Sequence, residues 1–200
     1  MKLLLIGDSH CDVRKLRQLP SHDLAVHLGD LGLADTYKKI LKRPNARTFR
    51  VLGGNHDEYP ALVQYPHYLG DYGWVPGLEE QVGFVRGAAS PDKLTRFKDQ
   101  NWWAEEELKY EELNEFLNWY EQSKPRIMLS HTAPKCVARR LIPPGFSLFK
   151  TGTEEALDQA LGLHAPEAWY FGHFHVNHTL THEGCKFTCI NKQDWLVLDL

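Results

Sequence analysis

Short apolar runs that each stop at a polar loop constrain this sequence more than any other feature. The runs Lys2–Gly7, Asp23–Leu28 and Thr48–Leu52 are typical of buried strands, and helical patterns lie between them. The order strand, helix, strand, helix, strand implies right-handed crossovers, so it predicts a parallel sheet. The polar loops after the strands are therefore expected to lie at one edge of one sheet.

Later segments continue the pattern less regularly. Further strands are predicted at Gln81–Arg86, Arg126–Leu129, Ala168–Phe171, Val176–Thr181, Lys186–Ile190 and Trp195–Leu200, the last three forming an antiparallel closing sheet. Helices are predicted from Asp12 to Leu19, from an N-cap at Asp35 to Leu41 before Pro44, and at Ala104–Gln122, Lys135–Leu141 and Thr153–Leu163, with a break at Pro143-Pro144-Gly145. The acidic run Glu105–Glu107 is expected to be a solvated first turn of the longest helix.

Length, charge and cysteine usage exclude several classes of protein. A chain of 200 residues fits one domain, and it should bury about 70% of its unfolded surface. A net charge of −3 argues against a protein that holds nucleic acid mainly through a basic field. The apolar stretch Leu3–Ile6 is too short for a signal peptide or a membrane span, so we expect a cytoplasmic protein. The four dispersed cysteines predict free thiols.

The strand ends carry an unusual set of side chains. Gly, Asn and Asp are common in ordinary solvated turns, so no single loop is decisive. Five ends in turn, however, carry oxygen or imidazole donors: Asp8 with His10, Asp30, Asn55 with His56, His131, and His173 with His175. At least seven such groups without a thiolate predict two transition-metal ions, because one ion would leave several donors unpaired. A shared carboxylate could hold the ions roughly 3.5–4 Å apart.

These motifs resemble those of the calcineurin-like metallophosphoesterase superfamily. The matching stretches are Asp8-Ser9-His10, Gly29-Asp30, Gly54-Asn55-His56-Asp57, His131 and Gly172-His173-Phe174-His175, in the order of that family. The resemblance implies one domain over residues 1–200, with an α/β fold in which two mixed sheets are flanked by helices as a four-layer α/β/β/α sandwich. It also implies that Asp8, His10, Asp30 and His175 hold one metal ion, and that Asp30, Asn55, His131 and His173 hold the second.

The resemblance implies a hydrolytic mechanism as well. Two cations lower the pKa of a shared water and neutralise phosphate oxygens, so hydroxide can attack a phosphoester near neutral pH. His56 would lie near the leaving-group oxygen and stabilise or protonate it, and Asp57 would orient His56. Manganese is the expected metal, with iron, zinc, nickel or cobalt as alternatives.

The substrate class is indicated by an arginine that is missing. Protein phosphatases of this superfamily carry Gly-Asp-x-x-Asp-Arg-Gly, whereas Asp30 is followed here by Leu-Gly-Leu-Ala-Asp. Because a diester carries one charge fewer than a monoester, weaker cationic binding suffices, and this favours a phosphodiester. A monoesterase stays open, since Arg96, or Arg139 with Arg140, could supply the cation. The alternative for these three is that they are ordinary surface arginines.

Other functions stay open at this stage. The retromer scaffold subunit resembles this superfamily but lacks a complete catalytic set, so a non-catalytic scaffold is one alternative. A nuclease is another, because Trp102 and Trp103 could stack bases, although tryptophans are more often packed in a core. The segment Ala89–Arg96 is interpreted either as a substrate-facing flap or as a surface loop pinned by these tryptophans. A serine hydrolase built on Ser130 is not supported, since no Gly-x-Ser-x-Gly motif occurs.

Overall fold

The strands form two mixed sheets in the computed structural model, which describes residues 1–43, 45–142 and 151–200. One sheet has the order β10-β1-β2-β3 and the other β4-β5-β6-β7-β9-β8. The strands are β1 (Lys2–Ile6), β2 (Leu24–His27), β3 (Phe49–Val51), β4 (Tyr72–Trp74), β5 (Val82–Val85), β6 (Ile127–Ser130), β7 (Ala168–Phe171), β8 (His178–His182), β9 (Cys185–Cys189) and β10 (Trp195–Asp199). Pro44 and the break predicted at residues 143–145 lie outside the described residues.

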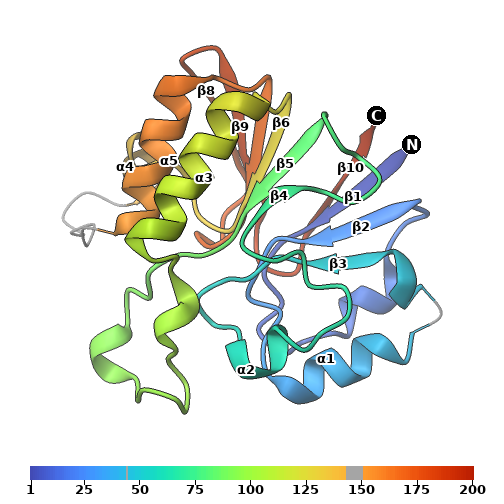
Figure 1. The fold of residues 1–200 in the computed structure, drawn as a ribbon. Coiled ribbons are helices and arrows are strands. Elements are labelled where there is room, and N and C mark those ends of the chain that lie inside the picture. Colours follow the sequence, from blue (N-terminus) through green and yellow to red (C-terminus); the bar gives the residue numbers. More distant parts are fainter. Residues whose placement is uncertain (44, 143–150) are drawn as a thin grey trace.

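Helices cover the outer face of each sheet, as Figure 1 shows. The α-helices are α1 (Ala34–Leu41), α2 (Tyr59–Leu62), α3 (Tyr110–Ser123), α4 (Lys135–Leu141) and α5 (Gly152–Leu163). Short 3-10 helices are η1 (Lys15–Gln18), η2 (Ala46–Thr48), η3 (Lys93–Thr95) and η4 (Ala104–Glu106). Helices α3, α4 and α5 lie against the six-stranded sheet, and α1 lies on the side of the four-stranded sheet (Figure 1). The predicted four-layer α/β/β/α sandwich is confirmed.

The continuous apolar run of β1 reflects its place between two layers. Side chains alternate between the faces of a strand. Leu3 and Leu5 therefore pack in the core between the two sheets, whereas Leu4 and Ile6 pack in the core on the α1 side. All four are 0% exposed. Burying both faces holds the end of β1, and the loop that follows it, in a fixed position.

The expectation of a single sheet edge is wrong. Strands β1, β2 and β3 are parallel in the first sheet, but β6 and β7 pair in the second. The closing strands are also divided, because β8 pairs antiparallel with β9 whereas β10 pairs antiparallel with β1. The polar loops nevertheless meet, since the two packed sheets present the relevant strand ends to the same end of the sandwich.

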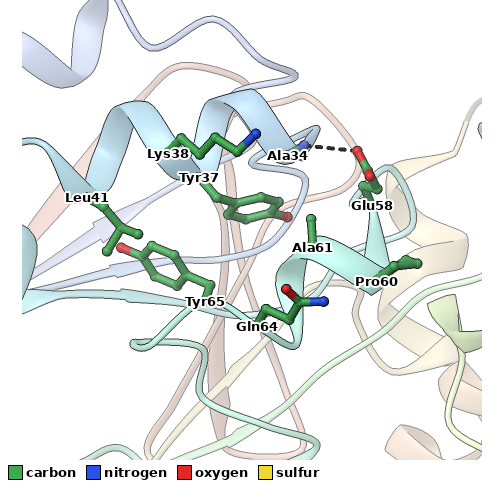
Figure 2. Close-up of a pocket in the computed structure, with 9 residues that line it drawn as sticks. All are labelled: Ala34, Tyr37, Lys38, Leu41, Glu58, Pro60, Ala61, Gln64 and Tyr65. Atoms are coloured by element: carbon green, nitrogen blue, oxygen red, sulfur yellow. Dashed lines mark hydrogen bonds between the residues drawn. The ribbon is translucent and has the colours of Figure 1, made fainter.

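The start of α1 differs from the prediction. Asp35 does not cap this helix, which has Leu33 at its N-cap position. Glu58 replaces the missing cap from a distant loop, because its Oε2 accepts a hydrogen bond from the Ala34 N–H at 2.9 Å (Figure 2). A carboxylate at this position satisfies a free N–H group and complements the helix dipole. Asp35 instead lies exposed and pairs with Lys38 at 3.4 Å.

The long helix predicted at Ala104–Gln122 is also shorter in the structure. Residues Ala104–Glu106 form the 3-10 helix η4, and α3 begins only at Tyr110. The acidic run is not a solvated turn throughout, since Glu106 is 3% exposed. Strand β4 and helix α2 were not predicted.

The segment from Ala88 to Leu108 protrudes beside the sandwich at the lower left of Figure 1 and is called the flap from here on.

Candidate functional site

The polar side chains that follow the strands converge on one site. Asp8 and His10 follow β1, Asp30 follows β2, Asn55 follows β3, His131 follows β6, and His173 and His175 follow β7. Two groups of these side chains offer ligand atoms within 4.8 Å of one another: Asp8 with His10 and His175, and Asp8 with Asp30 and His131. The structure therefore brings together all seven candidate ligand residues from two sheets.

The first cluster forms around one oxygen of Asp8. His175 Nε2 lies 2.9 Å from Asp8 Oδ2 and 2.9 Å from His10 Nε2. His10 Nε2 in turn lies 3.7 Å from Asp8 Oδ2 and 3.7 Å from Asp30 Oδ2. Two imidazole nitrogens and two carboxylate oxygens thus surround one point.

The second cluster forms around the carbonyl oxygen of Asn55. Asn55 Oδ1 lies 3.0 Å from His131 Nε2 and 2.9 Å from His173 Nδ1. His131 Nε2 also lies 3.3 Å from Asp30 Oδ1. The other nitrogen of His131, Nδ1, is 2.8 Å from the Leu28 carbonyl oxygen. Because a carbonyl oxygen can only accept a hydrogen bond, Nδ1 of His131 carries a proton and donates it here. The other nitrogen, Nε2, therefore faces the cluster.

Asp30 belongs to both clusters through different oxygens. Its Oδ2 faces His10 in the first cluster, and its Oδ1 faces His131 in the second. Asp30 has a φ of 55°, in the left-handed region that a residue with a Cβ rarely adopts. His10, His173 and His175 share this conformation, with φ values of 44°, 66° and 54°. Left-handed backbone at four of these residues is typical of a site where side-chain placement outweighs local strain.

Two glycines explain how closely these loops approach. A Cβ added at Gly54 would lie 2.3 Å from Asp30 Oδ1, and one added at Gly172 would lie 2.3 Å from Asp8 Oδ1. No side chain can be accommodated at such distances. The glycine before Asn55 and the glycine before His173 therefore make space for the two carboxylates.

The buried acids of the site stay ionised. Burial raises the pKa of Asp8, but the imidazoles of His10 and His175 beside its Oδ2 outweigh it and hold this pKa well below 3.8. Burial also raises the pKa of Asp30, but the charge of His131 outweighs it and lowers this pKa to about 2. For His131, burial lowers the pKa, yet the charge of Asp30 raises it to about 10 overall. Two carboxylates in so buried a site require positive charge nearby.

The residues fit a pair of divalent cations. Asp8 Oδ2 is buried and makes no hydrogen bond of good geometry, although it is the oxygen that both histidines face. Burial, together with the charge of His131, lowers the pKa of His173 to about 3, which keeps this ring neutral as a ligand must be. Carboxylate, amide oxygen and imidazole are ligands of divalent transition metals. The orphaned oxygen and this donor set match the dinuclear site expected from the sequence.

His56 lies next to these clusters without belonging to them. Its ring centroid is 5.1 Å from that of His10 in an edge-on arrangement. Burial lowers the pKa of His56, so its ring is predominantly neutral near pH 7 and still offers one N–H donor. His10 and His56 line a cavity of about 330 Å³ with flap residues that include Asp92, Arg96 and Trp103. This cavity is open to an organic group beside the candidate metal site.

Asp57 does not contact the His56 ring, which corrects the expected orienting role. Its Oδ2 accepts hydrogen bonds from the N–H groups of Asp30 and Gly54, at 2.9 and 2.8 Å. Its Oδ1 accepts from the Gly32 N–H at 2.8 Å and the Tyr37 hydroxyl at 2.7 Å. With four donors already bound and 0% exposure, Asp57 orders the backbone that carries Asp30 and Asn55.

The three arginines considered for substrate binding occupy different places. Arg96 lines the cavity beside His56, but its guanidinium donates to the Asn55 carbonyl oxygen at 3.1 Å. Asp92 and Glu106 oppose its charge at 3.6 and 3.9 Å. Arg139 and Arg140 lie exposed in the last turn of α4 and do not line that cavity. Arg96 is therefore a buried, paired residue of the flap rather than a free surface cation.

Sequence reasoning missed two residues that contact the site. Ser90 and Glu106 are 5% and 3% exposed and lie at opposite ends of the flap. Ser90 Oγ is 3.2 Å from Asn55 Nδ2 and 2.7 Å from Glu106 Oε2. The sequence offered no periodic or motif signal for them, since Glu106 sits in an acidic run that resembles a solvated helix start.

One of the two tryptophans of the flap is packed in a core. Trp103 is 6% exposed and belongs to the core on the α1 side, while the ammonium group of Lys93 lies 4.3 Å from the Trp102 ring centroid. His27 is 0% exposed, and its Nε2 is 2.8 Å from Ser9 Oγ. All four cysteines are free thiols, as expected. Within the described residues, no helix has the length and apolar character needed to cross a membrane.

A second cleft of about 380 Å³ lies between α1 and α2. Figure 2 shows Tyr37 and Tyr65 in its wall, with the Glu58 carboxylate and the Lys38 amino group at its rim. Because the Tyr37 hydroxyl donates to Asp57, this cleft lies behind the loops that carry Asp30 and Asn55. None of the seven candidate ligands lines it.

Comparisons with known proteins agree with this geometry. A family model described as calcineurin-like phosphoesterase matches residues 1–177. Among solved structures, the chain is similar to a phosphopantetheinyl hydrolase from Mycobacterium tuberculosis, with a TM-score of 0.65, 14% identity, and coverage of 96% of this chain and 90% of that one. It is also similar to a dimetal phosphatase from Danio rerio, with a TM-score of 0.57, 13% identity, and coverage of 97% and 88%. No curated protein matches the chain in sequence.

Proposed function

Because this chain belongs to the calcineurin-like phosphoesterase family, we propose that it hydrolyses phosphodiesters at a dinuclear site. The family supports a metal-dependent phosphoester hydrolase. The observation that carries the proposal for this chain is Asp30, whose two oxygens face two separate clusters of ligand atoms. A carboxylate placed in this way can bridge two metal ions.

The ligands divide between the two positions as the clusters do. Asp8, His10 and His175 would hold one ion, and Asn55, His131 and His173 the other, with Asp30 between them. When bound, divalent ions supply a water of lowered pKa and neutralise phosphate oxygens. Manganese is the proposed metal, because carboxylate and amide oxygens suit it and imidazole accepts it.

His56 has the position for acting on the leaving group. Its ring lines the cavity with that of His10 and supplies no atom to either ligand group, while its main-chain N–H donates to Asp30 Oδ1 at 2.7 Å. As the ester bond breaks, negative charge develops on the leaving oxygen, and an N–H of His56 would donate to it. The cavity of about 330 Å³ on this side would hold the organic group of that oxygen.

The charge around the cavity supports a diester over a monoester. Arg96 is the one arginine among the described residues that line the cavity. Its Nη1 lies 3.6 Å from Asp92 Oδ1 and 3.9 Å from Glu106 Oε2, so these two carboxylates offset its charge. A doubly charged monoester would therefore meet little free positive charge beyond the two metal ions. A diester carries one charge fewer and has a second organic group for the cavity.

Hydrolysis of two matched chromogenic esters tests the proposal. Metal-stripped protein is refilled with Mn²⁺ and assayed with bis-p-nitrophenyl phosphate beside p-nitrophenyl phosphate, with Asp30→Asn as the blank. Faster metal-dependent cleavage of the diester is the expected result. A strong monoester preference would refute the substrate assignment, whereas no hydrolysis by protein that binds two ions would point to a scaffold instead.

A further inference from the structure

The side chain of Asn55 has to present one particular end to the candidate metal site. An amide has an oxygen, which can bind a cation, and an NH₂ group, which cannot. In the structure Oδ1 lies among His131, His173 and Asp30, while Nδ2 points to Ser90 Oγ at 3.2 Å. Because Asn55 is 1% exposed, water does not compete for either end.

The hydrogen bonds of Ser90 determine this orientation. A serine hydroxyl has one proton to donate and two lone pairs that accept. Ser90 donates its proton to Glu106 Oε2 at 2.7 Å, and the Ser90 N–H donates to Glu106 Oε1 at 2.8 Å. Ser90 Oγ therefore has only acceptor capacity left for Arg96 Nη1 and Asn55 Nδ2.

A flipped amide would lose this contact. With Oδ1 turned toward Ser90, two acceptors would face each other, and the NH₂ group would face the ligand cluster. Arg96 also donates to the main-chain carbonyl oxygen of Asn55 at 3.1 Å, which fixes the backbone of the same residue. Both side chains that hold Ser90 come from the flap, so the flap is attached directly to one candidate metal ligand.

We infer that Ser90, held by Glu106 and Arg96, is a positioning residue that turns the Asn55 carbonyl oxygen toward the second metal position. The inference rests on the proposed dinuclear function. It assigns the flap a role in metal binding that is separate from any contact with substrate. Partners of this kind typically change metal affinity about 10- to 100-fold when they are removed.

Manganese binding tests this role without an activity assay. Metal-stripped protein is titrated with Mn²⁺, and free Mn²⁺ is followed by electron paramagnetic resonance. Ser90→Ala should keep one ion at wild-type affinity and bind the other about 10- to 100-fold more weakly. Ser90→Thr, which keeps the hydroxyl, should restore much of the loss. Thr95→Ala is the matched control, since the exposed Thr95 hydroxyl bonds only to the Asp92 carbonyl oxygen on the same flap.

A second experiment starts from the variant Asn55→Asp, in which the orientation of side chain 55 no longer matters. Aspartate has two equivalent oxygens, so in Asn55→Asp the added Ser90→Ala change should cost less than about 3-fold in affinity, against 10- to 100-fold with asparagine. Two ions bound equally well by Ser90→Ala and wild type would overturn the inference, as would equal losses in Ser90→Ala and Thr95→Ala. Failure of the wild-type protein to bind two ions would instead overturn the proposed function, and the inference with it.

Discussion

Replacing Asp57 by asparagine changes one buried group that holds two loops and helix α1 at once. In the native protein, Asp57 accepts four hydrogen bonds, three from main-chain N–H groups and one from Tyr37. Asparagine has nearly the same shape, but one of its two ends is a donor. If the NH₂ group turns toward Gly32 and Tyr37, the Tyr37 hydroxyl can accept from it, but the Gly32 N–H is left facing a donor.

The magnitude follows from the one hydrogen bond that is lost in that orientation. A hydrogen bond to a charged group contributes about 1.5–3 kcal/mol, so Asp57→Asn should lower the free energy of unfolding by about that amount. Domains are stable by about 5–15 kcal/mol in total, so the variant should still fold. Tyr37→Phe removes a single donor and should cost about 1.5–3 kcal/mol.

Urea unfolding of the metal-free protein measures these differences. Burial, and after it the charge of Asp30, raise the pKa of Asp57 to about 6, so the experiment is done at pH 8, where the carboxylate is ionised. With a slope of about 3 kcal/mol per molar urea, the midpoint of Asp57→Asn should fall by about 0.5–1 M. A midpoint within 0.3 M of wild type, taking about that as the error, would refute the reasoning.

Three further predictions concern His56, metal binding and Glu154. His56→Ala should still bind two ions but lose about 10²- to 10⁴-fold in kcat. The exposed control His178→Ala should keep both its metal binding and its kcat. Loss of metal binding in His56→Ala would contradict the role assigned to His56. Mn²⁺ at about 100 times its Kd should stabilise the protein by about 2.7 kcal/mol for each ion bound, which raises Tm by roughly 5–11 °C per ion, and Asp30→Asn should abolish the rise. Burial raises the pKa of Glu154 to about 7 from 4.5. The folded state therefore binds more protons than the unfolded state between these values, and stability should fall from pH 4.5 to 7 relative to Glu154→Gln, whose unfolding curve checks the sign.

The place of the candidate ligand residues in the fold was predictable because each lies within a few residues of the end of a buried strand. Asp8, Asp30 and Asn55 come after apolar runs that end abruptly, and the backbone carries them to a fixed place. Pairing between strands was less predictable, because nothing local to β10 indicates that β1 is its partner. The expectation of one sheet failed for this reason.

The supporting contacts were hidden from the sequence for a related reason. Glu106 lies in an acidic run and Ser90 in a proline-containing loop, and each pattern is typical of solvated residues. Ser90 contacts Asn55, which is 35 positions away, and Glu106 contacts Ser90 from 16 positions away. Likewise, Asp35 has the residue type and position of an N-cap, but Glu58 satisfies the free Ala34 N–H from another loop. Tertiary contacts override such local preferences.

The pairing of β1 with β10 determines when the site can be completed during synthesis. Lys2 is paired with Asp199, and Ile6 with Trp195, so the strand that leads to Asp8 gains one neighbour only after residues 195–199 have left the ribosome. The main chain next to Asp8 depends on the same late segment, because the Gly7 N–H donates to the Asp194 carbonyl oxygen and the Gln193 N–H donates to that of Asp8. Contacts this distant in sequence form slowly. A nascent chain that stops before residue 193 would carry all seven candidate ligands without the strand that fixes the first of them.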